Sequence, residues 1–441
     1  MKRIEIADWA VNEALQKGAQ AARAELSCID MLNVQCEDAE VSTLQQNSGC
    51  GLVLRLFVDG RFGTFSTNRL DRTEISALIA NGIACTRLLS IDADRTLPDP
   101  SRYYRSESLE ANRQEALALE SYLENDPTLD PVQLALSIGQ PVLGSDPRLI
   151  SFTTQFGTRS GWQYVADSQG FRGISFCSNA YAYSSASLHD EGDSRPSDGW
   201  LETGIGYADL LPLLPDLGRK ALQAAQWRLG AGPVKPGLYH LAIEPVCLMK
   251  LIDPLLDAMS GFNLYAHRSF LAGKLGQQIA SSSFTLTEEP QRKGAFGACL
   301  YDLEGVRTRF TDLIRKGCLQ TYFLSTYYAR KLQMEPTLSS SNVLCIEPGT
   351  RSRQAILNDC PEAILITGFL GGNCNELTGD FSFGIEGQLF RYGERVQGVS
   401  GMNITGNMLQ LWQSVSEIAN DVERTFDGFF PTVFFEKISL Q

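Results

Sequence analysis

The three histidines of this chain are the first residues to consider for chemistry. His189, His240 and His267 are the only histidines among 441 residues, and they are widely separated. A metallohydrolase zinc site usually takes two or three histidines, as in H-E-x-x-H, where the i and i+4 positions place both imidazoles on one helix face. No such pair exists here. We therefore expect no metal site built from this chain's own residues.

A second candidate for chemistry is the thiol of Cys374, in the run Gly371-Gly372-Asn373-Cys374-Asn375. Backbone N–H groups of a glycine-rich loop can stabilise a thiolate. A Cys/His dyad would nevertheless need one of the dispersed histidines nearby, which spacing alone does not show. The Gly-x-Ser-x-Gly elbow of serine hydrolases is absent. We interpret the segment as turn residues around an incidental thiol.

Phosphate and carboxylate chemistry find no better support. The sequence has neither a Walker motif nor a G-x-G-x-x-G that opens a helix after a strand. Acid pairs such as Asp253/Asp257 and Glu288/Glu289 are expected by chance among 51 acidic residues. None of these signals names an enzyme class, so we expect no catalytic residue in this chain.

The overall charge limits the choice of partners. Lys and Arg total 38 against 51 Asp and Glu, which gives a net charge of −13. An acidic protein repels phosphate, so we expect neither direct nucleic-acid binding nor attraction to an anionic membrane. No run approaches the roughly 18 apolar residues of a spanning helix, and Glu5 and Asp8 interrupt the segment where a signal peptide would be apolar. A cytoplasmic protein is the expectation.

The eleven cysteines are scattered and contain no C-x-x-C pair. An odd number without metal-ligand spacing is typical of reduced thiols in a reducing compartment. We expect reduced, mostly buried thiols.

Hydrophobic periodicity predicts the elements of the first half. Asp59-Gly60 between two apolar runs is a strong hairpin signal, because both turn residues need positive φ. Asp71 and Glu74 fit a capping box at a helix start. The other expected elements are a helix through 7–15, a helix over 113–123, strands over 149–154, 162–165 and 175–184, and a helix over 217–229.

Residues 230–237 contain Pro233 and Pro236 and have the composition of a linker. We therefore expect one domain over 1–230 and a second over 231–441. In the second, the patterns predict a strand over 238–244, a helix over 245–259, a strand over 363–367, a turn at Glu386-Gly387 and a helix from Met408 to Val422.

Several ordered motifs in the second half are similar to those of one family. The chain resembles the TldD/PmbA family, also called modulators of DNA gyrase, and the resemblance extends to 51–68 and so spans nearly the whole chain. The motifs are Ser269-Phe270-Leu271-Ala272-Gly273-Lys274-Leu275-Gly276, Phe284 to Pro290, Tyr301 to Val306, Leu313 to Gly317, Thr378-Gly379-Asp380-Phe381-Ser382, Val399-Ser400-Gly401 and Ile404-Thr405-Gly406-Asn407.

The resemblance implies an α+β fold of two domains, an N-terminal α/β sandwich-like domain and a C-terminal β-rich domain with flanking helices. It also implies a pair of cytoplasmic subunits that together form a metalloprotease acting on peptides. A TldD-type subunit carries zinc on an H-E-x-x-x-H helix, and a PmbA/TldE-type subunit lacks that motif. Here the corresponding helix reads Cys247-Leu248-Met249-Lys250-Leu251-Ile252-Asp253. The chain thus resembles the PmbA/TldE side, with no cofactor of its own and zinc in a TldD-type partner.

The glycine motifs near the C-terminus are the expected substrate-binding residues, namely Gly371, Gly372, Asn373, Thr378, Gly379 and Asp380. An extended peptide can add as a strand to a sheet edge, and glycines let a foreign backbone approach closely. The alternative is that these glycines only permit tight turns. The expected partners are a TldD-type catalytic subunit and a peptide, and a homodimer is one state that the isolated chain could adopt.

Two other functions remain open at this point. One is a gyrase-modulating binding protein. The other is a self-sufficient hydrolase with an unrecognised site, for which Cys374, His267 and Glu304 are candidates because they fall in or near the family motifs. Leu303 departs from the family pattern, in which an acidic residue usually stands there, and an altered groove or partner surface is as plausible as drift in a loop.

Overall fold

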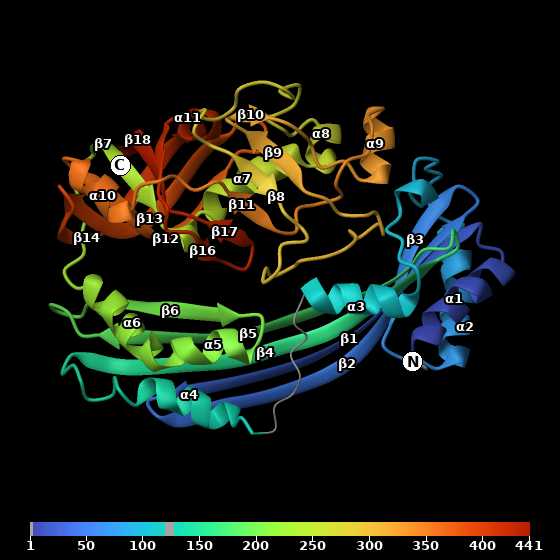
Figure 1. Ribbon diagram of the computed structural model, residues 1–441, viewed down its shortest axis with the longest axis horizontal. Helices are drawn as coiled ribbons and strands as arrows, with labels where there is room; N and C mark the ends of the chain where they lie inside the picture. Colours follow the sequence, from blue (N-terminus) through green and yellow to red (C-terminus); the bar gives the residue numbers. More distant parts are fainter. Residues whose placement is uncertain (1–2, 120–127) are drawn as a thin grey trace.

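The computed structural model describes residues 3–119 and 128–441 and shows a mixed α+β architecture with three six-stranded sheets among them (Figure 1). The first sheet is long and curved, and the two others lie together above it in the view of Figure 1. The expectation of an α+β fold with a β-rich C-terminal part is confirmed. Among the described residues, no helix is long and apolar enough to cross a membrane.

The first sheet has the strand order β3-β2-β1-β4-β5-β6. Its strands are β1 Ala21–Glu37, β2 Glu40–Val58, β3 Arg61–Thr67, β4 Leu149–Asp167, β5 Arg172–Leu188 and β6 Ser197–Gly204. The accompanying helices are α1 Ile4–Gln16, α2 Arg72–Thr86, α3 Leu109–Leu119, α4 Pro131–Gly139, α5 Tyr207–Leu210 and α6 Leu214–Trp227, with 3-10 turns at η1 Pro100–Arg102 and η2 Leu211–Leu213. Helices α1 and α2 lie at one end of the sheet, α4 to α6 lie toward the other, and α3 lies between them (Figure 1).

Local sequence determines the start of this sheet as predicted. Asp59 and Gly60 adopt φ of 50° and 69° in the turn between β2 and β3. The Asp71 carboxylate accepts a hydrogen bond from the backbone N–H of Glu74 at 2.9 Å and caps α2. Alternate residues of β1 and β2 point to one face, where Leu26 and Leu54 pack against α1 and α2 in one core.

Two short predicted strands are one continuous strand. The runs 149–154 and 162–165 both belong to β4, which pairs along its length with β1 and β5. Glycines and polar residues between the two runs interrupt the apolar pattern from which a strand is predicted. The residues form a strand nevertheless, because β1 and β5 pair with it on its two sides. The helix predicted over 113–123 is observed as α3 up to Leu119, and its last residues lie outside the described part of the chain.

The other two sheets come from residues 237 onward. The second has the order β10-β9-β8-β11-β17-β16, with β8 Leu286–Glu288, β9 Thr311–Arg315, β10 Cys318–Leu319, β11 Leu344–Ile346, β16 Glu423–Arg424 and β17 Gly428–Phe430. The third has the order β14-β13-β12-β7-β18-β15, with β7 Gly237–Ile243, β12 Ala363–Cys374, β13 Asp380–Arg391, β14 Glu394–Asn407, β15 Val415–Ile418 and β18 Val433–Leu440. The helices are α7 Met249–Met259, α8 Gly261–Tyr265, α9 Thr326–Leu332, α10 Arg353–Asp359 and α11 Met408–Gln413, with a 3-10 turn at η3 Pro245–Cys247.

The third sheet curls, because β14 also pairs with β18 through Ile404 and Leu440. A large apolar core fills the space that α7 and both C-terminal sheets enclose, and it includes fully buried Trp412 and Phe435. Every strand of the first sheet precedes residue 230, and every strand of the other two follows it. The boundary at residue 230 stays a prediction with which this division agrees.

Two expectations for the C-terminal elements are wrong. Glu386-Gly387 is not a turn, because β13 continues to Arg391 and the chain reverses at Tyr392-Gly393, where φ is 48° and 80°. The Glu386 carboxylate instead pairs with Arg228 at 2.6 Å. The helix predicted from Met408 to Val422 ends at Gln413, because the next residues form β15 and pair with β18.

The expectation that all cysteines are reduced and mostly buried is also wrong. Cys28 and Cys50 stand opposite each other in the β1–β2 register and form a disulfide, a proximity that their spacing in the sequence conceals. Among the free cysteines, Cys36 and Cys345 are buried, Cys85 is exposed, and the others are intermediate.

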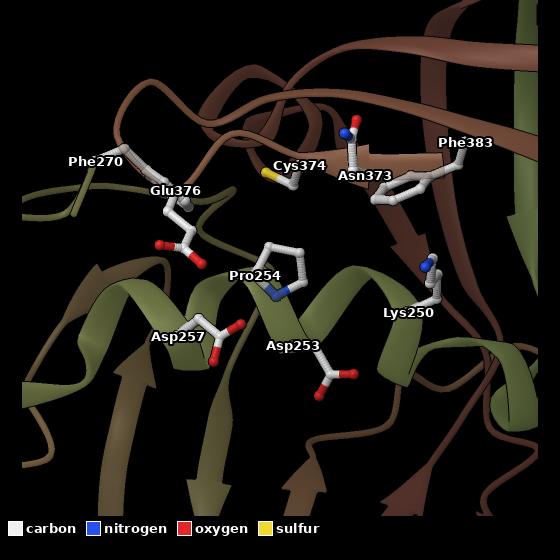
Figure 2. Close-up of a pocket in the computed structure, with 9 residues that line it drawn as sticks. All are labelled: Lys250, Asp253, Pro254, Asp257, Phe270, Asn373, Cys374, Glu376 and Phe383. Atoms are coloured by element: carbon white, nitrogen blue, oxygen red, sulfur yellow. The ribbon is translucent and has the colours of Figure 1, made fainter. Parts of the chain in front are cut away.

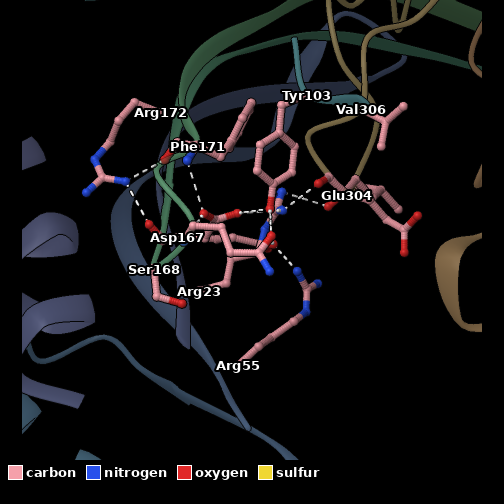
Figure 3. Close-up of polar contacts among 12 residues, drawn as sticks. Arg23, Arg55, Tyr103, Asp167, Ser168, Phe171, Arg172, Glu304 and Val306 are labelled. Carbon is pink, nitrogen blue, oxygen red and sulfur yellow. Dashed lines mark hydrogen bonds and ion pairs between the residues drawn. The ribbon is translucent and has the colours of Figure 1, made fainter. Parts of the chain in front are cut away.

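A buried arginine joins the first sheet to the C-terminal half (Figure 3). Arg23 of β1 donates hydrogen bonds to the carbonyl oxygens of Glu304 at 2.7 Å and Leu303 at 2.9 Å. Its guanidinium also lies 3.9 Å from the buried carboxylate of Asp167, which accepts a hydrogen bond from the Tyr103 hydroxyl at 2.6 Å. Leu303 accepts the Arg23 hydrogen bond through its backbone carbonyl alone, and the residue is 66% exposed. The arginine contact therefore does not depend on which side chain occupies position 303.

Candidate functional site

A pocket of about 190 Å³ opens between helix α7 and the connection from β12 to β13 (Figure 2). Strand β7 runs directly into η3 and α7, so this helix occupies the place after the first strand of the C-terminal half. The lining residues are Lys250, Asp253, Pro254 and Asp257 from α7, Phe270 from the following loop, and Asn373, Cys374, Glu376 and Phe383 from the β12–β13 region.

Helix α7 is amphipathic: one face packs in the hydrophobic core, and the other lines the pocket. Leu251, Ile252 and Leu255 are fully buried in the core. Lys250, Asp253 and Asp257 all line the pocket. Lys250 and Asp257 are seven positions apart, about two helical turns, and so lie on the same side of the helix. Pro254 lies inside the helix and has no N–H to donate to the carbonyl of Lys250.

The opposite wall is the end of the β12–β13 hairpin. The register between the strands shifts between Leu370 and Asn373, so that Asn373 pairs with Ser382 and Cys374 with Phe381. Asn373 and Cys374 line the pocket on the side opposite α7, and Figure 2 shows both above that helix, with the Asn373 amide pointing away from it.

The pocket carries more negative than positive charge. Asp253, Asp257 and Glu376 contribute three carboxylates against the single ammonium of Lys250, which lies 4.9 Å from the centre of the Phe383 ring. Within the described part of the chain, none of the three carboxylates takes part in a hydrogen bond or an ion pair. Partial burial, together with neighbouring carboxylates, raises the pKa of Asp253 and of Asp257.

The same surroundings affect the thiol. Burial, and then the nearby carboxylates of Asp380, Asp257 and Glu376, raise the pKa of Cys374 to about 11. The thiol is therefore protonated at neutral pH and is a poor nucleophile.

The structure separates the sequence-predicted site residues into two groups. Gly371, Gly372 and Asn373 form the bulge at the end of β12, and of these Asn373 lines the pocket. Gly371 has φ of 64° and nothing within 4 Å of the place where a Cβ would stand. Gly372 has φ of 86°, and a Cβ there would collide with the Ser382 carbonyl oxygen. Gly372 is thus required by the local packing, whereas Gly371 faces open space.

The second group, Thr378, Gly379 and Asp380, forms the turn that leads into β13. The Thr378 hydroxyl donates to the Asp380 carboxylate at 2.7 Å, and the Asn407 side-chain amide donates to the same carboxylate at 2.9 Å. These hydrogen bonds lower the pKa of Asp380. A Cβ on Gly379 would lie 3.2 Å from the Phe270 ring, which itself lines the pocket. This group supports the pocket wall from behind.

The residues considered for a self-sufficient hydrolase are not gathered around Cys374. His267 is exposed, and it does not line the pocket. Glu304 accepts hydrogen bonds from the backbone N–H and the hydroxyl of Thr326 at 2.9 Å, so its carboxylate holds the start of α9. The geometry does not support a catalytic dyad at Cys374.

Sequence reasoning missed the α7 wall and treated Asp253/Asp257 as a chance pair. The available signal was the spacing of Lys250, Asp253 and Asp257 on one helix face, opposite buried leucines. Among the described residues there is no group of three or more His, Cys, Asp or Glu side chains that could hold a metal ion. The α7 residues that line the pocket are Lys250, Asp253, Pro254 and Asp257, and no histidine is among them.

Comparisons with known proteins define the class. Residues 236–441 match the family described as PmbA/TldA metallopeptidase C-terminal domain, and residues 30–85 match PmbA/TldA metallopeptidase domain 1. The chain is 25% identical to metalloprotease PmbA of Escherichia coli O157:H7, across 95% of this chain and 92% of that protein. It is 24% identical to the metalloprotease PmbA homolog of Haemophilus influenzae, across 98% and 94%. These matches define a metallopeptidase-related protein.

Solved structures agree with this class. A protein of Bacteroides thetaiotaomicron, described as a proposed modulator of DNA gyrase, superposes with a TM-score of 0.93 at 36% identity, across 99% of this chain and 98% of that one. The fold is also that of TldE from Thermococcus kodakarensis, with a TM-score of 0.85 at 21% identity and 99% coverage of both chains. The chain belongs to the PmbA/TldD family, and the resemblance inferred from its motifs is confirmed.

Proposed function

We propose that this chain is the non-catalytic, PmbA/TldE-type subunit of a cytoplasmic zinc metallopeptidase that processes or degrades peptides. In this proposal a TldD-type partner holds the zinc ion. The observation that carries the proposal is the α7 wall. At the place where the family resemblance puts H-E-x-x-x-H, the helix presents Lys250, Asp253 and Asp257 to the pocket.

The chemistry of the pocket supports binding rather than bond cleavage. Cys374 is a protonated thiol at neutral pH, because its pKa is about 11. An amide side chain such as that of Asn373 can both donate hydrogen bonds to a peptide backbone and accept them from it. The space beside Gly371 is open, which leaves room for a peptide backbone to pass. We propose that Gly371 and Asn373 contact the peptide, and that Gly372, Thr378, Gly379 and Asp380 hold the hairpin in position.

The proposal is tested with the assembled pair of subunits. Asn373→Ala removes one hydrogen-bonding group at the pocket rim and should lower kcat/KM for peptide cleavage about two- to tenfold, the value of one neutral hydrogen bond. Asn68→Ala is the matched control, because Asn68 is exposed and lies outside the pocket lining. The assay measures cleavage of an unfolded peptide and, by size-exclusion chromatography, the amount of assembled pair.

The expected result is reduced cleavage at unchanged assembly for Asn373→Ala and wild-type cleavage for Asn68→Ala. An unchanged kcat/KM in Asn373→Ala would contradict the proposal that the peptide contacts Asn373 in this pocket. Peptide cleavage by the isolated wild-type chain would contradict the non-catalytic role itself.

A further inference from the structure

The disulfide between Cys28 and Cys50 has a cation beside it, the guanidinium of Arg3 at the start of helix α1. The Arg3 Nη1 atom lies 3.0 Å from the Cys50 sulfur and 3.8 Å from the Cys28 sulfur. Among the described residues, these two sulfurs are the only side-chain partners of Arg3, and no carboxylate lies within ion-pair distance of it. The positive charge of Arg3 therefore acts on the sulfurs without a competing partner.

The two sulfurs differ in exposure but share one rigid frame. Cys28 is 8% exposed, whereas Cys50 is partly exposed and so is the sulfur that a small molecule reaches more easily. The two residues stand directly opposite each other, and the β1–β2 register is continuous on both sides of them, from Ala21 to Gln35 of β1. The strand pairing therefore keeps the sulfurs adjacent when the bond between them is broken, so that the bond can form again.

Several other cysteines have the opposite surroundings. Burial, and then a nearby carboxylate, raises the pKa of four other thiols, namely Cys247, Cys345, Cys360 and Cys374. Such thiols stay protonated and react slowly. A thiolate beside an arginine is instead stabilised, and the charged group that contacts Cys28 and Cys50 is an arginine.

We propose that Cys28 and Cys50 form a reversible thiol-exchange site for a small cellular monothiol of the glutathione class. The thiolate of the small molecule attacks the Cys50 sulfur and forms a bond to it. The Cys28–Cys50 bond breaks, and Cys28 leaves as a thiolate beside Arg3. The product of this step is a mixed disulfide on Cys50.

A second small thiolate completes the reduction of the site. It attacks the sulfur of the bound small molecule, which releases the Cys50 thiolate next to Arg3 and forms a disulfide of two small molecules. The two protein sulfurs gain two electrons and take up two protons from water, while the two small thiols lose the same number of each. Oxidised small thiol reverses both steps.

Arg3 favours both steps because the leaving sulfur carries negative charge next to its guanidinium. A neighbouring cation lowers the pKa of a thiol, and a leaving thiol of lower pKa departs faster. This site is independent of the proposed peptidase role, since it uses neither the pocket nor a partner subunit.

The test uses the full, folded chain with reduced and oxidised glutathione near pH 7. Acid quenching, alkylation and peptide mass spectrometry measure free thiol and glutathione adduct at Cys28 and Cys50 over time. We expect wild type to lose the disulfide in reduced glutathione, to pass through an adduct on Cys50, and to recover the disulfide in oxidised glutathione.

Arg3→Gln removes the charge but keeps a polar side chain, and it should slow the reduction about three- to tenfold. The matched control is Arg69→Gln, because Arg69 is 72% exposed and pairs with Glu74 rather than with a sulfur. The control should exchange at the wild-type rate. Circular dichroism verifies that both variants are folded.

The wild-type measurement needs no variant, so it decides the matter even where Arg3→Gln fails to fold. A disulfide that resists glutathione until urea unfolds the chain would overturn the inference. Thiols at Cys28 and Cys50 that stay reduced in oxidised glutathione would overturn it as well. An adduct on Cys28 in place of Cys50, or equal rates for Arg3→Gln and Arg69→Gln, would contradict the assigned order of attack and the role of Arg3.

Discussion

The buried Arg23 offers the sharpest test of how the two halves of the chain are held together. Its side chain is 3% exposed and contacts the Glu304 and Leu303 carbonyls, the Asp167 carboxylate and, at 3.2 Å, Glu25 (Figure 3). Arg23→Ala removes the cation beside a carboxylate that is itself fully buried and leaves two carbonyl oxygens without a donor.

Breaking a buried ion pair by removing one partner costs about 3–5 kcal/mol, because the remaining charge stays in a medium of low polarity. The two carbonyl oxygens that lose their donor are only partly buried, so they add less than the about 1–3 kcal/mol of a fully buried unsatisfied group. These costs overlap at one site, and part of the cavity can admit water. We therefore expect Arg23→Ala to lower the free energy of unfolding by about 3–5 kcal/mol.

Arg55→Ala is the control, because Arg55 pairs with Glu25 at the same strand pair but its side chain is 30% exposed. This pair is partly exposed, and Glu25 keeps Arg23 as a second partner, so we expect Arg55→Ala to cost about 1 kcal/mol or less. Urea unfolding, followed by tryptophan fluorescence and circular dichroism, measures both variants against wild type. Equal, small losses for Arg23→Ala and Arg55→Ala would refute the reasoning that buried charge and interdomain hydrogen bonds stabilise this junction.

Two further predictions follow from named residues. Burial raises the pKa of Glu288 to about 7, above the value of about 4.3 for an unfolded glutamate. The raised pKa stabilises the folded state fully below about pH 4, and this stabilisation is lost as the pH rises through 7. Between pH 6 and 8 wild type should lose about 1 kcal/mol relative to Glu288→Gln in urea unfolding, and parallel pH profiles of the two proteins would contradict this. Gly372→Val should destabilise the chain by more than about 2 kcal/mol, because positive φ and the Ser382 carbonyl both oppose a side chain. Gly371→Asn should cost about 1 kcal/mol or less, since Asn tolerates this φ; equal melting temperatures for the two glycine variants would be the contrary result.

The elements that could be predicted are those that local sequence determines. The Asp59-Gly60 turn and the Asp71 cap each depend on a few adjacent residues whose backbone preferences are strong. The helix predicted over 245–259 is also observed, as the turn η3 and helix α7. The family motifs added the fold class, because several ordered matches identify a whole chain rather than one element.

The elements that were mispredicted depend on distant partners. Apolar residues from Met408 to Ile418 fit a helical stripe, but β15 forms because β18 offers Phe434 and Phe435 as pairing partners. Gly157 interrupts the pattern of β4, and it is needed where the Tyr181 ring of β5 crosses the strand. No local pattern contains either contact.

The pocket could not be predicted for the same reason. Its two walls come from α7 and the β12–β13 hairpin, which lie more than a hundred positions apart and meet only through the fold of the third sheet. The disulfide partner of Cys28 is likewise defined by the β1–β2 register.

The zinc content of the purified chain tests the central claim most directly. The chain is expressed and purified in medium supplemented with zinc, alone and together with a TldD-type subunit, and bound zinc is measured by atomic emission alongside chelator-sensitive peptide cleavage. The account predicts that the isolated chain carries far less than one zinc ion and cleaves nothing, whereas the assembled pair carries zinc and cleaves peptide. One tightly bound zinc ion per isolated chain, with cleavage that a chelator abolishes, would contradict it.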